Sequence, residues 1–129
     1  MRRNTLERQL RSDPDVNRFG RLFEHFIVLE TYRLMKYLSP DGRLYFWRTK
    51  DDQEVDLLLE NRGKLIAAVE IKSSTKISRE YLSSLKSFSE EHPNLPCYVV
   101  ARVPEAYELD VVNILPWEQY LTKLQSWLA

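Results

Sequence analysis

The chain has 129 residues, the length of one domain that can bury its own core without disulfide bonds. Its composition, 43% hydrophobic and 29% charged with only three Gly, excludes disordered and collagen-like chains. The 19 basic and 19 acidic residues cancel, so the net charge gives no argument for a nucleic-acid partner. Cys97 is the only cysteine, and no apolar run approaches the ~18 residues of a membrane span. These features predict a cytoplasmic protein without membrane contact.

Hydrophobic spacing and turn residues predict the order of secondary structure. A capping Asp followed by Pro14 marks a helix start, and apolar residues three and four positions apart continue the helix to about Leu38. Strand-like runs follow at 43–49, 54–60 and 64–72, and a three-residue loop ending in Gly joins the last two as a hairpin. The order is completed by a second helix after Ser78, strands at 96–103 and 111–115, and a last helix from Pro116.

This order predicts an α/β domain. A three-stranded meander joined through a crossover helix to a further strand makes a mixed central sheet flanked by helices. The predicted core is therefore α-β-β-β-α-β, with an added C-terminal strand and helix. Residues 17–129 are predicted to form this domain, and residues 1–16 a polar N-terminal segment, interpreted as the tail of a missing upstream region.

Several common kinds of active site are excluded by residue counts. The three glycines lie far apart, so no glycine-rich phosphate loop exists and the chain is not itself an ATPase. One cysteine and two distant histidines, His25 and His92, do not have the spacing of a zinc site. Cys97 begins an apolar strand, which favours a small core residue over a nucleophile.

The sequence suggests one candidate catalytic site, formed by Asp56, Glu70 and Lys72. Side chains alternate faces along a strand, so Glu70 and Lys72 share one face of the third predicted strand. A hairpin turning at 61–63 sets Asp56 opposite Ala68 and makes Glu70 its diagonal neighbour on the same face. Two carboxylates and an ammonium are therefore expected to meet at one place on the sheet.

Such a group of charges suits phosphodiester hydrolysis with Mg²⁺ or Mn²⁺. Converging carboxylates repel unless a cation neutralises them, and Mg²⁺ is typically held by one or two carboxylates and several waters. The metal polarises a phosphoryl oxygen, while a nearby lysine can orient the attacking water and offset the developing negative charge. The alternative interpretation is structural: a cross-strand ion pair of Asp56 with Glu70 and Lys72 at a sheet edge, worth ~0.2–1 kcal/mol.

Five short sequence motifs are each common by chance, but their combination is specific for one family of proteins. They are Phe19-Gly20-Arg21-Leu22-Phe23-Glu24-His25-Phe26, Trp47-Arg48-Thr49, Glu54-Val55-Asp56, Val69-Glu70-Ile71-Lys72-Ser73 and Leu115-Pro116-Trp117. With the order of elements, they resemble the PD-(D/E)XK nuclease superfamily. They look most like a bacterial and archaeal family of unknown function that forms the C-terminal part of AAA-type ATP-binding proteins. The superfamily places a Pro before its first acidic residue, where this chain has Val55.

The resemblance implies roles for four residues. Asp56 and Glu70 would be metal ligands, Lys72 the catalytic lysine, and Glu24 a contact to the metal or its water from the first helix. The implied function is a Mg²⁺-dependent nuclease-like domain that hydrolyses nucleic-acid phosphodiesters, DNA rather than RNA, as part of an AAA-type ATPase.

The alternative function is a non-catalytic module that keeps this fold to bind a protein, such as its ATPase neighbour. The absence of a basic stripe in the sequence favours this alternative, because phosphate binding normally requires clustered basic residues. An exposed apolar patch near residues 1–20, with self-association through it to form a homo-oligomer, is also expected.

Overall fold

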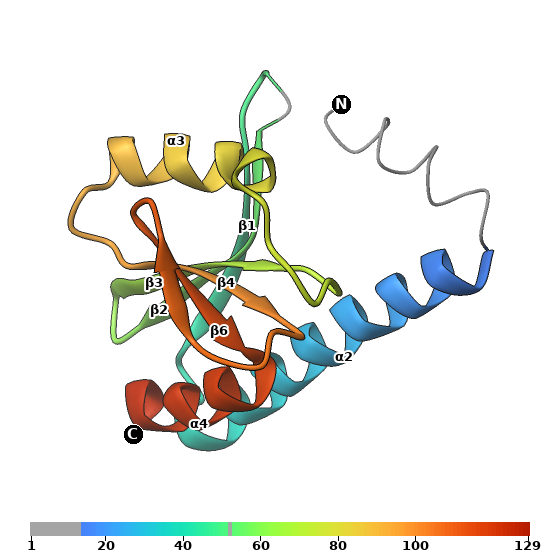
Figure 1. Ribbon diagram of the computed structural model, residues 1–129. Helices are drawn as coiled ribbons and strands as arrows, with labels where there is room; N and C mark the ends of the chain where they lie inside the picture. The colour runs from blue at the N-terminus through green and yellow to red at the C-terminus, as the bar shows by residue number, and fades with distance from the viewer. Residues whose placement is uncertain (1–13, 52) are drawn as a thin grey trace.

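A six-stranded mixed sheet with helices on both faces forms the centre of the molecule (Figure 1). The computed structural model describes residues 14–51 and 53–129, so most of the predicted polar segment 1–16 lies outside the described residues. The elements are α2 (Pro14–Leu38), β1 (Arg43–Arg48), β2 (Glu54–Asn61), β3 (Lys64–Ile71), the 3₁₀ helix η1 (Arg79–Leu82), α3 (Ser83–Glu91), β4 (Cys97–Ala101), β5 (Tyr107–Leu109), β6 (Val112–Pro116) and α4 (Trp117–Leu128). The predicted order of helix, three strands, helix and strand is confirmed.

The strand order in the sheet is β1-β2-β3-β4-β6-β5. The first three strands are an antiparallel meander, and β3, β4 and β6 run parallel to one another. The connection from β3 to β4 passes through η1 and α3, as a parallel pair requires. Strand β5 was not predicted from the sequence because three residues are too few to show a periodic apolar pattern.

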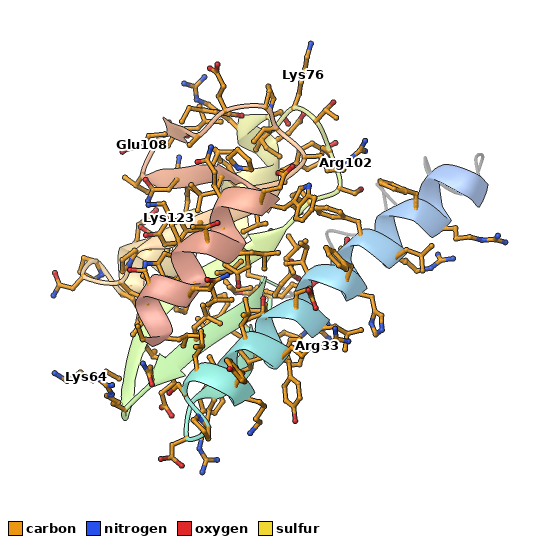
Figure 2. The ribbon with its side chains drawn as sticks, turned by 90° about the horizontal axis from the view of Figure 1, so that it is seen from below. Arg33, Lys64, Lys76, Arg102, Glu108 and Lys123 are labelled. Atoms are coloured by element: carbon orange, nitrogen blue, oxygen red, sulfur yellow. The ribbon has the colours of Figure 1, made fainter. Side chains whose placement is uncertain are left out.

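Two apolar clusters cover the two faces of the sheet. The cluster under α2 and α4 includes Ile27, Leu57, Val69 and Tyr120, all at most 1% exposed. Figure 2 shows these two helices side by side across one face of the sheet. The other cluster packs α3 against Ala68 and neighbouring strand residues. Because side chains alternate along a strand, β3 sends Val69 and Ile71 toward α2, and Ala68 and Glu70 toward α3.

The β2–β3 hairpin has a tighter turn than the sequence analysis predicted. Arg62 and Gly63 both have positive φ, 55° and 79°, which is the signature of a two-residue hairpin turn. Asn61 consequently pairs with Lys64, and an irregularity next to Leu59 shifts the register again. Leu58 pairs with Ala68, so the predicted placement of Asp56 opposite Ala68 is wrong.

Helix α2 exposes a row of apolar side chains. The first turns of this helix extend beyond the sheet in both views (Figures 1 and 2). Phe19, Leu22, Phe26 and Leu29 are 46%, 60%, 42% and 41% exposed, at three- and four-residue spacing. The predicted patch near residues 1–20 thus includes Phe19 and continues along α2, while its part at 1–13 lies outside the described residues. No helix of the described chain has both the length and the apolar character needed to span a membrane.

Candidate functional site

The candidate site lies where β2 separates from β3 near the end of β3. The β2–β3 pairing runs as far as Leu57 opposite Val69. On its other edge β2 is irregular, since Tyr45 pairs with Leu58 but Trp47 pairs with Val55, so β2 uses three residues where β1 uses two. This bulge includes Asp56, and bulges commonly redirect a side chain at the end of a pairing.

The carboxylate of Asp56 completes the β2–β3 pairing in place of a backbone group. Its Oδ2 accepts a hydrogen bond of 2.8 Å from the backbone N–H of Ile71. The carboxylate therefore lies against the peptide bond that joins Glu70 to Ile71. Asp56 is only partly exposed, and the hydrogen bond fixes the direction of its side chain.

Glu70 and Lys72 form an ion pair at the same strand end. Lys72 Nζ lies 3.3 Å from Glu70 Oε2, and the two side chains are 14% and 1% exposed. Lys72 Nζ also lies 5.6 Å from the centre of the Tyr81 ring on η1, within the range of a cation–π contact. Both charges therefore point to the face of the sheet that η1 and α3 cover.

A buried ion pair of this kind is unusual in energetic terms. Removing a carboxylate and an ammonium from water costs several kcal/mol for each ion, and their attraction only partly offsets this cost. Apolar side chains of similar size are often as stabilising at such a place. The predicted sheet-edge ion pair is also located differently, because β3 is the third of six strands and the pair joins Glu70 to Lys72, the first residue after β3.

Glu24 lies on α2, one turn after Gly20, where the helix approaches Ser73 at the end of β3. Its side chain is exposed, and α2 packs on the face that receives Val69 and Ile71 rather than Glu70 and Lys72. The structure thus brings Asp56, Glu70 and Lys72 to one strand end. It places Glu24 on the helix that crosses the opposite face.

At the strand end Asp56 and Glu70 supply two carboxylates, the type of donor that Mg²⁺ uses in proteins. Residues 14–51 and 53–129 contain no group of three or more His, Cys, Asp or Glu side chains placed to hold a metal ion. Mg²⁺ is commonly bound through one or two carboxylates, with water supplying the remaining ligands. Asp56 and Glu70 are the residues that would hold it.

Cys97 and the histidines stand apart from this site. Cys97 is 2% exposed at the start of β4, and burial raises the pKa of its thiol to about 11, as expected for a packed residue rather than a nucleophile. The His92 ring stacks on Phe88 with the ring centres 4.2 Å apart. His25 is exposed on α2.

The fold and the charged strand end define a mixed α/β domain with a buried acid–lysine pair inside its sheet. The sequence profile of the family described as "Domain of unknown function (DUF4143)" matches residues 19–120. The chain belongs to this family. The matched range begins in α2, ends in α4 and contains Asp56, Glu70 and Lys72. No curated protein and no solved structure gave a significant match.

Proposed function

We propose that this domain is a metal-dependent nuclease-like phosphodiesterase that acts on nucleic acid, DNA in preference to RNA. The observation that carries the proposal is the position of the Asp56 carboxylate, hydrogen-bonded to the N–H of Ile71 between Glu70 and Lys72 in the chain. The resemblance to the PD-(D/E)XK superfamily supports the same assignment, because it matches these three residues in their roles. A place at the C-terminus of an AAA-type ATPase and a cytoplasmic setting belong to the same proposal.

In the proposed mechanism, Asp56 and Glu70 hold the cation and Lys72 acts on the reacting groups. A bound Mg²⁺ or Mn²⁺ would supply Lewis-acid polarisation of the phosphate. Lys72 carries three N–H donors and lies 3.3 Å from Glu70 Oε2, so it can orient water for in-line attack and offset charge on the phosphate oxygens. The Tyr81 ring limits the positions open to the ammonium.

A cleavage assay with matched acidic variants tests the proposal. The protein is incubated with labelled DNA and RNA oligonucleotides in Mg²⁺, Mn²⁺ or EDTA. We expect metal-dependent cleavage that falls by roughly 100-fold or more in Asp56→Asn, the usual size of such an electrostatic loss. Glu54→Gln is the control, because Glu54 lies on the same strand and pairs with Arg48 at 2.7 Å. Cleavage that survives in Asp56→Asn would contradict the proposal.

Protein binding is a second candidate function, and the exposed row Phe19, Leu22, Phe26 and Leu29 favours it. Contiguous apolar side chains on a helix surface mark contact sites for other proteins. The ATPase module or a second copy of this chain is the expected partner. Light scattering at micromolar concentration tests the second copy, since self-association should fall in Leu22→Glu. A monomer of 15.4 kDa throughout would count against self-association.

A further inference from the structure

A second group of side chains converges at the carboxyl end of the same strands, on the face that α2 covers. Arg102 follows β4, and its Nη1 donates a 3.2 Å hydrogen bond to the carbonyl of Ser73. The backbone N–H of Arg102 donates to the carbonyl of Ser74 at 3.0 Å. The guanidinium carbon lies 4.7 Å from the centre of the Phe19 ring on α2. Figure 2 shows Arg102 at this end of the sheet, toward the first half of α2.

These contacts hold the guanidinium in place while leaving it exposed. Arg102 is exposed overall, and within the described residues only Nη1 donates a hydrogen bond to a protein group. A guanidinium has five N–H donors in a planar fork, which matches the oxygens of a phosphate. The contact with Phe19 and the hydrogen bond already restrict the Arg102 side chain. Binding an anion therefore costs less side-chain conformational entropy than it would for a mobile surface arginine.

Gly20 allows α2 to approach the Ser73 hydroxyl closely. A Cβ added at Gly20 would lie 3.2 Å from Ser73 Oγ, closer than ordinary contacts, so a larger residue would crowd the hydroxyl. Ser73 is half-buried and directly follows Lys72 in the chain. Ser73 therefore meets Arg102 through its carbonyl and lies close to Gly20 through its hydroxyl, where the first turns of α2 reach the ends of β3 and β4.

We propose that Arg102 and Ser73 bind a phosphate of the polynucleotide strand next to the phosphate that Asp56, Glu70 and Lys72 act on. This inference rests on the proposed function and names its substrate contact. Lys72 and Ser73 are consecutive in the chain at the carboxyl end of β3, and their side chains leave on opposite faces, toward η1 and α2. One polynucleotide strand that crosses this end of the sheet would therefore pass both groups. The sequence analysis gave no signal for this site, because Arg102 lies 29 positions from Ser73 and reaches it only through the β3–β4 pairing.

Binding measured without cleavage tests the site independently of catalysis. Fluorescence anisotropy of a labelled 20-mer oligonucleotide is followed in EDTA over a range of salt concentrations. Arg102→Ala should weaken binding about tenfold and reduce the salt slope by about one, as the loss of one phosphate contact does. Arg102→Lys should recover only part of the affinity, and Ser73→Ala, which preserves the guanidinium, should show a smaller loss.

Arg33→Ala is the matched control, because Arg33 is an exposed arginine of α2 paired with Glu30 at 3.2 Å. Figure 2 shows it on α2 away from Arg102. Equal binding by wild type and Arg102→Ala, or an equal loss in Arg33→Ala, would overturn the inference. Thermal melts identify variants with altered folding, and Ser73→Ala then carries the test.

The outcomes also separate this inference from the proposed function. If Arg102→Ala weakens binding in EDTA but wild type never cleaves, the phosphate contact stands and hydrolysis fails. If wild type cleaves and Arg102→Ala binds and cleaves equally well, the inference fails alone. Binding of inorganic phosphate by a protein that does not bind the oligonucleotide would overturn the assignment to a polynucleotide.

Discussion

The two ends of the β3–β4 pair are equally buried but chemically opposite. At the amino end Ala68 pairs with Cys97, and both side chains are at most 2% exposed and uncharged. Toward the carboxyl end Glu70 pairs with Val99 and is 0% exposed, yet it holds an ion pair with Lys72. Burial raises the pKa of the Cys97 thiol to about 11, so the amino end keeps its titratable group neutral.

The difference between the neutral and the charged end shows that the stability of the sheet does not explain the residues at the carboxyl end. A neutral thiol packs as a small apolar residue and needs no partner. A buried carboxylate and ammonium cost desolvation energy that an apolar pair would avoid. The carboxyl end therefore has charged residues that the packing of the sheet does not require, which is why we assign function to that end.

Replacing Lys72 by Met should have the largest effect on the free energy of unfolding. It leaves the carboxylate of Glu70 buried without its cation, a change that typically costs about 3–5 kcal/mol. Urea denaturation without metal at neutral pH measures it. The double variant Glu70→Gln with Lys72→Met should recover most of the loss, and a single variant as stable as wild type would mean that water reaches Glu70.

At the amino end, the expected effect is a loss of stability at high pH. The folded thiol has a pKa of about 11 and the unfolded thiol about 9. The stability that the buried neutral thiol contributes is therefore fully present below pH 9. It is lost as pH rises from 9 to 11, because the unfolded chain releases the proton first. At pH 10.5 the loss should be about 2 kcal/mol, since one pKa unit corresponds to about 1.4 kcal/mol.

Urea denaturation of wild type and Cys97→Ala at pH 8 and pH 10.5 isolates this contribution from that of the tyrosines. The difference in stability between the two proteins should shrink at the higher pH. A difference that stays constant between the two pH values would show that the thiol is not buried from water.

The smallest change in the free energy of unfolding is expected at an ion pair that lies outside the β3–β4 pair. Arg48 and Glu54 lie 2.7 Å apart across β1 and β2, with the arginine side chain 58% exposed. Exposed pairs contribute about 0.2–1 kcal/mol, so Arg48→Met should change the free energy of unfolding by less than about 1 kcal/mol. A cost as large as that of Lys72→Met would remove the distinction between buried and exposed pairs.

Much of the fold could be predicted because its signals are local. The apolar spacing in α2, the hairpin turn and the crossover helix each lie within one segment, and the order of elements followed from them. The β2–β3 register did not follow, because the turn at Arg62 has two residues rather than three and the pairing shifts again next to Leu59. With Leu57 opposite Val69, Asp56 reaches the peptide between Glu70 and Ile71 rather than the predicted position opposite Ala68.

The other parts of the site depend on contacts between distant segments. Nothing near Tyr81 or Arg102 in the sequence indicates that one contacts Lys72 and the other Ser73. An exposed apolar patch near residues 1–20 was expected, but its extension along α2 to Leu29 was not, because a helix with apolar residues on several sides does not reveal which side the sheet covers. The spacing of apolar residues predicts which face of a helix is apolar, but only tertiary packing determines which element covers that face.

Isothermal calorimetry of Mn²⁺ binding tests the central claim most directly. The claim is that Asp56 and Glu70 hold one divalent cation at the end of β3. Wild type should bind one ion per chain, and Asp56→Asn should lose that binding while keeping its fold, because the amide oxygen can still accept the N–H of Ile71. A flat wild-type titration, or equal binding by the two proteins, would contradict the claim.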